Sequence, residues 1–275
     1  MVELGILFTE LFTYFIFAGL AYYFFYRLFR RVIKNRIIQK KFEGKDKILE
    51  EIKYSMSTVF IFTFNFAVVY HLQERGYTRH YKEVSEYGVF YLFISAFLMI
   101  LLHDTYFYWA HRLMHHPLLY RHVHLIHHKS TNPSPFAAYA FHPLEAFAEI
   151  AILYLIAFII PYHEYAIMMW WGYMLFFNVM GHLGVELFPA DFLEKGILKW
   201  QNSATHHNMH HKFFNFNYGL YFNVWDGLMK TVHPKYYESF KEITSRGEQL
   251  KMAAFLESLN EESSGENEDK EFNEE

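Results

Sequence analysis

The segment at residues 103–128 reads HDTYFYWAHRLMHHPLLYRHVHLIHH, and eight of its 26 residues are histidine. A second burst, THHNMHH at residues 205–211, places four more histidines within six positions. Neutral imidazole is the commonest metal ligand among side chains, so the two bursts predict a metal site. The histidines of the first burst are His103, His111, His115, His116, His122, His124, His127 and His128.

The composition indicates a membrane protein. Hydrophobic residues make up 53% of the 275 residues and aromatic residues 21%, which is more apolar surface than one small core can hide. The net charge of −4 gives no basic surface for nucleic acid. The absence of cysteine excludes disulfides, iron–sulfur clusters and thiolate zinc sites, so any metal must be held by imidazole and carboxylate.

Three apolar segments precede or reach the first burst. A helix of about 20 residues crosses the hydrocarbon core of a bilayer, and each segment approaches that length. Only Glu10 interrupts the first of them. The candidate spans are residues 4–26, 54–73 and 87–102.

The charges between these spans predict their orientation. Residues 27–53 carry ten Lys/Arg against four Asp/Glu and should remain in the cytoplasm. The third span then ends on the cytoplasmic face, directly at His103. We expect its helix to continue past the bilayer through His111 and His115.

Two further apolar segments, 146–160 and 165–184, are separated by a polar turn that begins at Pro161. Only residues 150–160 of the first are free of charge, and a helix of that length is roughly 16 Å long, too short to cross untilted. The pair is therefore predicted to be a hairpin that barely spans or re-enters. In either case the chain returns to the same side, which brings the second histidine burst to the face of the first.

These segments predict an all-α integral membrane protein, a multi-pass bundle of four or five apolar helices with a cytoplasmic, histidine-rich cap that binds two metal ions. Residues 1–86 would hold the N-terminal spans and the basic loop, and residues 87–240 the catalytic domain. The acidic tail at residues 241–275 is expected to be disordered.

The spacing within the bursts favours metal binding over a structural role. Histidines four apart share one face of a helix, and those three apart are also neighbours, so each box is expected to converge on one point. Eight imidazoles exceed one tetrahedral ion and suit two, while Zn, Cu, Fe and Ni all remain open. The boxes are His111/His115, His124/His127/His128 and His207/His210/His211.

Other polar residues are candidates to complete the site. His182 lies at the end of an apolar segment, where an ionisable residue indicates function, and His142 is a second candidate ligand. The carboxylates of Asp104, Glu145 and Asp226 are candidates to accept hydrogen bonds from the outer nitrogens of ligating rings.

The remaining histidines are better explained by structure than by chemistry. For His103 an interfacial position and a functional role remain equally open. Out-of-register positions favour the surface for His116 and His122, and isolation favours an ordinary structural role for His71, His80, His163 and His233.

The ordered boxes closely resemble the fatty acid hydroxylase/sterol desaturase superfamily, over about residues 87–232. The set is far more specific than any one box, and the AFHPLE segment favours the sterol-desaturase-like branch. The stretches that carry the resemblance are HDTYFYWAHRLMHH, LYRHVHLIHH, STNPSPFAAYAFHPLE and NSATHHNMHHKFFNFNYGLYFNVWDGL.

The resemblance implies a set of metal ligands. His182 best matches the family's additional histidine near the hairpin, and His142 is a weaker match. Asn178, a candidate neighbour of the metal ligands, replaces a second histidine found one turn earlier in fatty acid hydroxylases. The box ligands would be His111, His115, His124, His127, His128, His207, His210 and His211.

The resemblance also implies the reaction: a di-iron enzyme that uses dioxygen and external electrons to hydroxylate or desaturate a membrane lipid. Zinc can replace iron in purified samples, and no fused haem or flavin domain is expected. Electrons would come from a separate ferredoxin or cytochrome b type donor with its reductase. The alternative is a histidine-rich membrane protein that carries metal or haem, in transport or electron transfer. A hydrolytic zinc enzyme is disfavoured because no HExxH motif is present.

Overall fold

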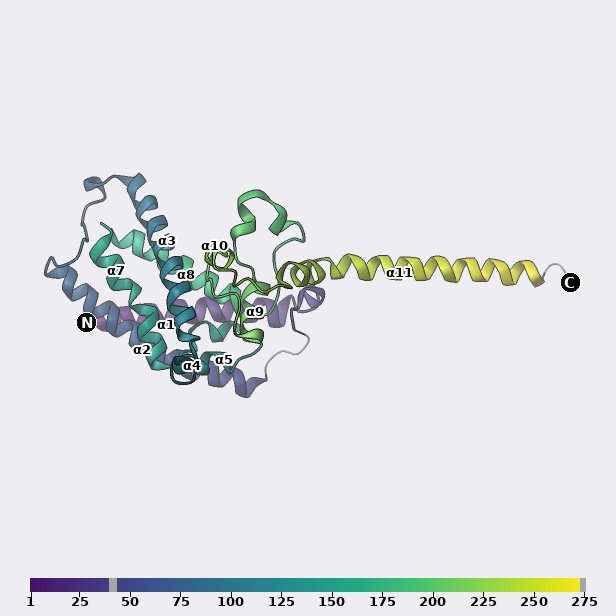
Figure 1. Ribbon diagram of the computed structural model, residues 1–275, viewed down its shortest axis with the longest axis horizontal. Helices are drawn as coiled ribbons and strands as arrows, with labels where there is room; N and C mark the ends of the chain where they lie inside the picture. Colours follow the sequence, from purple (N-terminus) through teal and green to yellow (C-terminus); the bar gives the residue numbers. More distant parts are fainter. Residues whose placement is uncertain (40–43, 273–275) are drawn as a thin grey trace.

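The computed structural model describes residues 1–39 and 44–272, with side chains as far as Glu257. Helices dominate the described residues, and the only β pairing among them consists of isolated bridges. A bundle forms the body of the molecule, and the long helix α11 (Tyr236–Phe272) projects from it (Figure 1). The prediction of an all-α fold is confirmed.

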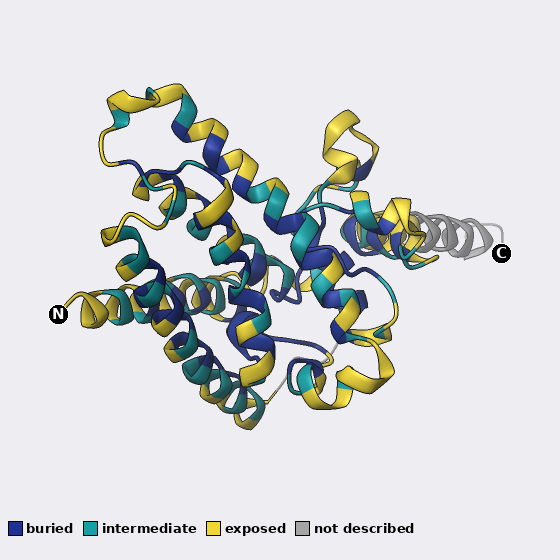
Figure 2. Cartoon of the chain, turned by 60° about the vertical axis from the view of Figure 1, so that its left-hand side comes forward, coloured by how far each residue is buried: buried dark blue, intermediate teal, exposed yellow. Residues whose placement is uncertain are grey.

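Among the described residues, three helices are long and apolar enough to cross a membrane, and they coincide with the first three predicted spans. They are α1 (Val2–Ala21), which continues as a π-helical segment η1 to Leu28, α2 (Lys45–Glu74) and α3 (Val89–Met114). Figure 2 shows that the outer faces of these helices are exposed while their inner faces are buried. Large exposed side chains such as Phe8 and Phe93 suit contact with lipid.

The predicted hairpin consists of α6 (Pro143–Ile150), α7 (Ile152–Ile159) and α8 (Glu164–Gly181). Its turn pairs with the loop between α2 and α3, because Tyr162 N donates to Arg79 O at 3.1 Å and Tyr81 N donates to Tyr162 O at 3.0 Å. That loop is at the end of α3 opposite to the histidines. The hairpin therefore reaches the far end of the bundle and returns, as the topology requires.

An aromatic core fills the space between α1, α2, α8 and the short helix η4 (Pro135–Tyr139). The rings of Tyr14 and Tyr139 stack with centroids 5.4 Å apart, and Phe62 meets Trp171 edge to face at 5.6 Å. Such pairs each add about 0.5–1.5 kcal/mol to the effect of burial. This packing gives the histidine cap a rigid base.

Short helices and turns build the cap and the remaining connections. Ser203 caps α9, since its Oγ accepts from His206 N at 3.3 Å. The elements are η2 (Lys34–Arg36), η3 (Val84–Glu86), α4 (Pro117–Val123), α5 (Leu125–His128), η5 (Phe192–Glu194), η6 (Gly196–Trp200), α9 (Ala204–Phe213) and α10 (Val224–Leu228).

The start of the predicted disordered tail is helical instead. In α11, Phe240 and Ile243 are buried, and Arg246 Nη1 donates to Ile37 O at 2.9 Å. These contacts stabilise a helix that composition alone did not indicate. Disorder is therefore the wrong prediction for residues 241–257, and the side chains of the later tail lie outside the described residues.

Candidate metal centre

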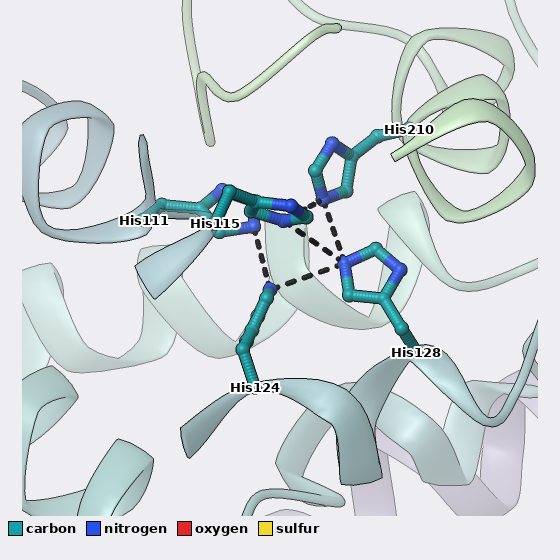
Figure 3. A group of neighbouring side chains, drawn as sticks. All are labelled: His111, His115, His124, His128 and His210. Atoms are coloured by element: carbon teal, nitrogen blue, oxygen red, sulfur yellow. Dashed lines mark hydrogen bonds between the residues drawn. The ribbon is translucent and has the colours of Figure 1, made fainter. Parts of the chain in front are cut away.

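Nine histidines of the cap form two groups, and within each group one nitrogen from every ring lies within 4.8 Å of the others. Figure 3 shows the first group, in which the five rings point toward a common centre. The five-histidine group contains His111, His115, His124, His128 and His210. The four-histidine group contains His127, His182, His207 and His211.

Four helices position these side chains. The helix α3 runs through His111 and ends at Met114, with His115 as its C-terminal cap. His182 caps the C-terminus of α8 in the same way. The residues around α5, and those of α9, supply the other six rings.

The two HxxHH boxes do not each converge on one point, contrary to the prediction. His124 and His128 belong to the five-histidine group, whereas His127 belongs to the other. In α9, His207 and His211 likewise share a group that excludes the intervening His210. Residues at i+3 and i+4 are about 100° apart around a helix, so one box can supply two neighbouring sites.

The outer nitrogen of several rings hydrogen-bonds to a carboxyl or backbone carbonyl oxygen. His124 Nδ1 lies 2.6 Å from Glu145 Oε1. A proton on Nδ1 leaves the lone pair on Nε2, which is the nitrogen that faces the centre of each group. Four more Nδ1 atoms donate to backbone carbonyls at 2.7–2.9 Å: His111 to Tyr218, His182 to Asn178, His210 to Phe216 and His211 to Ser130.

Inner nitrogens cannot satisfy one another where the proton of each ring is on Nδ1, because both then carry only a lone pair. The Nε2 atoms of His111 and His124 are 3.0 Å apart, and those of His182 and His207 are 3.1 Å apart. Burial lowers the pKa of His115 to about 2 and holds the pKa of His207 well below its usual value, with nearby histidines adding to both shifts. Neutral rings whose lone pairs face each other need a cation between them, so the residues present fit bound metal ions.

Two aspartates are predicted to contact the ligating rings directly. In the structure their carboxylates accept hydrogen bonds from backbone N–H groups instead. Asp104 Oδ1 accepts from Tyr221 N at 2.9 Å, and Asp226 Oδ1 accepts from Tyr218 N at 2.9 Å. Tyr218 in turn provides the carbonyl that orients His111. Asp226 therefore helps to orient His111 indirectly, through the backbone of Tyr218.

His142 lies in neither group. Its Nδ1 accepts from Leu144 N at 3.2 Å and caps α6, and the following proline occupies the first helical position. His116 and His122 are exposed and also lie outside both groups. His116 and His163 cap α4 and α8 in the same way, and the His233 ring accepts a similar hydrogen bond from Lys235 N in a turn.

The sequence did not separate His206 from its neighbour His207. The His206 ring is fully buried but points away from both groups, and its Nε2 lies 3.4 Å from Asp226 Oδ2. The backbone carbonyls that orient the ligands were also missed, because every residue type carries one.

Paired haem ligands need a macrocycle between them, and inner nitrogens about 3 Å apart leave no such space, which disfavours the haem carrier.

Comparison with known proteins agrees with this geometry. The profile of the family described as Fatty acid hydroxylase matches residues 96–231. Lathosterol oxidase of Homo sapiens is 31% identical over 78% of this chain and 69% of that protein. The Delta(7)-sterol 5(6)-desaturase of Aspergillus fumigatus is 33% identical over 86% of this chain and 63% of that protein. No solved structure matches.

These likenesses identify the general activity. The relatives are oxygen-dependent oxidoreductases by family, and the long apolar helices place the present chain in a membrane. The protein is therefore an oxygen-dependent membrane oxidoreductase that acts on lipids, as predicted. With its two histidine groups inside the matched region, the chain belongs to the fatty acid hydroxylase/sterol desaturase superfamily, on its sterol-desaturase-like branch.

Proposed function

We propose that this protein is a di-iron desaturase that introduces a double bond into a sterol with a Δ7 bond. The observation that carries the metal assignment is the pair of buried imidazole groups, five rings beside four, with their lone pairs turned inward. The activities for which the relatives are named, oxidation of lathosterol and 5(6)-desaturation of Delta(7)-sterols, support the substrate and the reaction.

The reaction balances with one dioxygen and two electrons. Two hydrogen atoms leave adjacent carbons of the lipid, dioxygen becomes two waters, and a separate donor protein supplies two electrons with two protons from solvent. Bound iron supplies the redox chemistry needed to break an unreactive C–H bond. The resemblance to the superfamily supports a separate ferredoxin or cytochrome b type protein, with its reductase, as the source of these electrons.

The chain's own residues hold and orient the reacting centre. The nine grouped histidines are the proposed ligands, and the carbonyls of Tyr218 and Asn178 keep the protons of His111 and His182 on the outer nitrogens. The carboxyl of Glu145 does the same for His124. Eight of the nine rings are buried and His115 is half-buried, so most of the site is shielded from bulk water.

An apolar cavity beside the four-histidine group is the proposed access route for the lipid. It lies between the end of α8 and the start of α9, and His207, Phe177 and Leu187 line it together with Asn178 and Leu220. We call it the access cavity. Its position between an apolar helix and the cap suits a substrate that leaves the bilayer sideways.

The histidine groups are proposed to face the cytoplasm. The basic segment at residues 27–53 follows α1, and Gln39 within it donates to Asn208 of α9 at 2.9 Å. The basic segment and the metal centre are therefore on the same side, and the excess of Lys/Arg assigns that side to the cytoplasm.

Lipid mass spectrometry tests the proposal. The chain would be produced in cells that make a Δ7-sterol but lack their own 5(6)-desaturase, with a His128→Ala variant as the inactive control. A product two hydrogens lighter, formed only with the wild-type chain and matched to a 5,7-diene standard, is expected. A product heavier by one oxygen would show hydroxylation instead, and an unchanged sterol pool with an altered acyl lipid would overturn the sterol assignment.

A further inference from the structure

A second cavity lies among buried residues of the bundle, next to the histidine cap. Its wall is apolar and aromatic apart from four polar side chains: His103, Tyr139, Glu149 and Asn178. The free volume of about 20 Å³ is enough for one water-sized group. We call it the hydroxyl cavity.

The hydrogen bonds of His103 fix its tautomer. Trp170 Nε1 donates to His103 Nδ1 at 3.2 Å, and the Tyr221 hydroxyl lies 2.9 Å from the same atom. An indole nitrogen can only donate, so Nδ1 is the acceptor and the proton of the neutral ring is on Nε2. The His103 side chain thus brings an N–H donor to a cavity wall made mostly of hydrocarbon.

Two other groups in the same wall are available for hydrogen bonding. Tyr139 is fully buried, and within the described part of the chain its hydroxyl has no hydrogen-bond partner. Glu149 adds a carboxyl group and is 9% exposed. A buried polar group without a partner costs free energy, so this combination of a donor, a hydroxyl and a carboxyl is suited to a small polar guest.

The hydroxyl cavity is adjacent to both histidine groups. The ring of Phe107, in its wall, is 5.0 Å from that of His111, and the ring of Phe141 is 5.2 Å from that of His127. The cavity also shares Asn178 and Leu220 with the access cavity. Because these residues belong to both walls, a group that enters the access cavity beside His207 is brought next to the hydroxyl cavity.

We propose that the hydroxyl cavity binds the alcohol group of the lipid substrate, with His103 and Glu149 as the specificity-determining residues and Tyr139 as their partner. The inference rests on the proposed sterol desaturation. An alcohol both donates and accepts, so it pairs with the Nε2–H of His103 and with the carboxyl of Glu149. An acyl chain has no polar group to offer at this depth, and a charged head group would not fit.

The test measures binding of two probes that differ only in the alcohol. Lathosterol and cholest-7-ene share one carbon skeleton, and their dissociation constants would be measured on the purified full chain in lipid nanodiscs. The wild type is expected to prefer lathosterol by about tenfold or more, since a site built for a hydroxyl rejects the analogue that lacks it. The ratio should fall to within about twofold in His103→Phe and Glu149→Leu, because neither replacement can hydrogen-bond.

A milder variant and a control distinguish loss of hydroxyl binding from loss of the fold. Tyr139→Phe removes one unpartnered hydroxyl, so the fold is kept and the ratio should fall by a few-fold. Ser95→Ala is the control, since Ser95 is fully buried on α3, donates to Leu92 O within its own helix and does not line the cavity. The control should keep the wild-type ratio.

Each contrary result has a distinct meaning. A wild type that converts lathosterol in cells yet binds both probes equally overturns the hydroxyl cavity alone. Unchanged ratios in folded variants, with only their melting temperatures altered, would mean a cavity that holds structural water and nothing more. Neither binding nor conversion of lathosterol would overturn the sterol substrate and this inference with it.

Discussion

The two histidine groups differ in their number of rings and in what holds them. Five rings meet in the first group, and α3 supplies His111 and its cap residue His115. Four meet in the second, where α8 contributes only His182. The second group also borders the access cavity through His207, whereas none of the five rings lines that cavity.

The two groups share some of the helices that hold them and differ in others. Both α5 and α9 contribute to both groups, because adjacent histidines in each box point to opposite sites. The helices α3 and α8 each serve one group. A site with four nitrogens beside an open cavity has less ligand redundancy than one with five, so we expect the four-histidine group to be the more easily lost.

His182→Ala should have the largest effect. With three nitrogens left, the four-histidine group should lose its ion, and the metal content should fall by about one per chain, as measured by mass spectrometry of the purified protein. Lipid oxidation should drop by more than about 100-fold. His115→Ala is the matched comparison, because four rings remain in its group. Equal metal loss in the two variants would contradict the difference in redundancy.

Glu145→Gln should act on the five-histidine group alone. The Glu145 carboxyl lies 2.6 Å from His124 Nδ1, and an amide would orient that ring less strongly. Loss of such a partner costs roughly 10–100-fold in metal affinity. Titration with a chelator should therefore release one ion early and the other at the wild-type concentration. Simultaneous release of both would show that Glu145 is not specific to one group.

Gly181→Ala should disturb the four-histidine group in a smaller way. A Cβ at Gly181 would lie 3.3 Å from the His207 ring, so the ring must shift by a few tenths of an ångström. We expect activity to fall by roughly tenfold or less, since small misplacements at a reacting centre are costly. Gly172→Ala is the control, because a Cβ there meets nothing within 4 Å and α8 is otherwise unchanged. Similar losses in both variants would point to the helix and not to His207.

The sequence predicted the elements better than the contacts between them. The apolar lengths located α1, α2 and α3, and the topology argument correctly required both bursts to meet at one end. Local spacing could not reveal that His127 and His128 serve different groups. That division depends on where α3 and α8 lie around α5, which is a property of tertiary packing and not of the box.

Capping explains why His142 was overestimated. A histidine before proline accepts a hydrogen bond from the backbone at the start of a helix, and the AFHPLE segment is such a start. The polar hydroxyl cavity was also hidden in the sequence. Tyr139 and Glu149 are 10 residues apart on different elements, and only folding against His103 brings them to one wall.

Ser203→Ala should have the smallest effect and should not distinguish the groups. The Ser203 side chain caps α9 and also accepts from the Tyr236 hydroxyl at 3.2 Å. Loss of an N-terminal cap costs about 0.5–2 kcal/mol of stability, so a lower melting temperature is expected with both ions retained. Because α9 carries ligands to both groups, any metal loss should be shared equally between them. Selective loss of one ion would contradict this expectation, because it would show that metal binding in one group depends more on α9 than in the other.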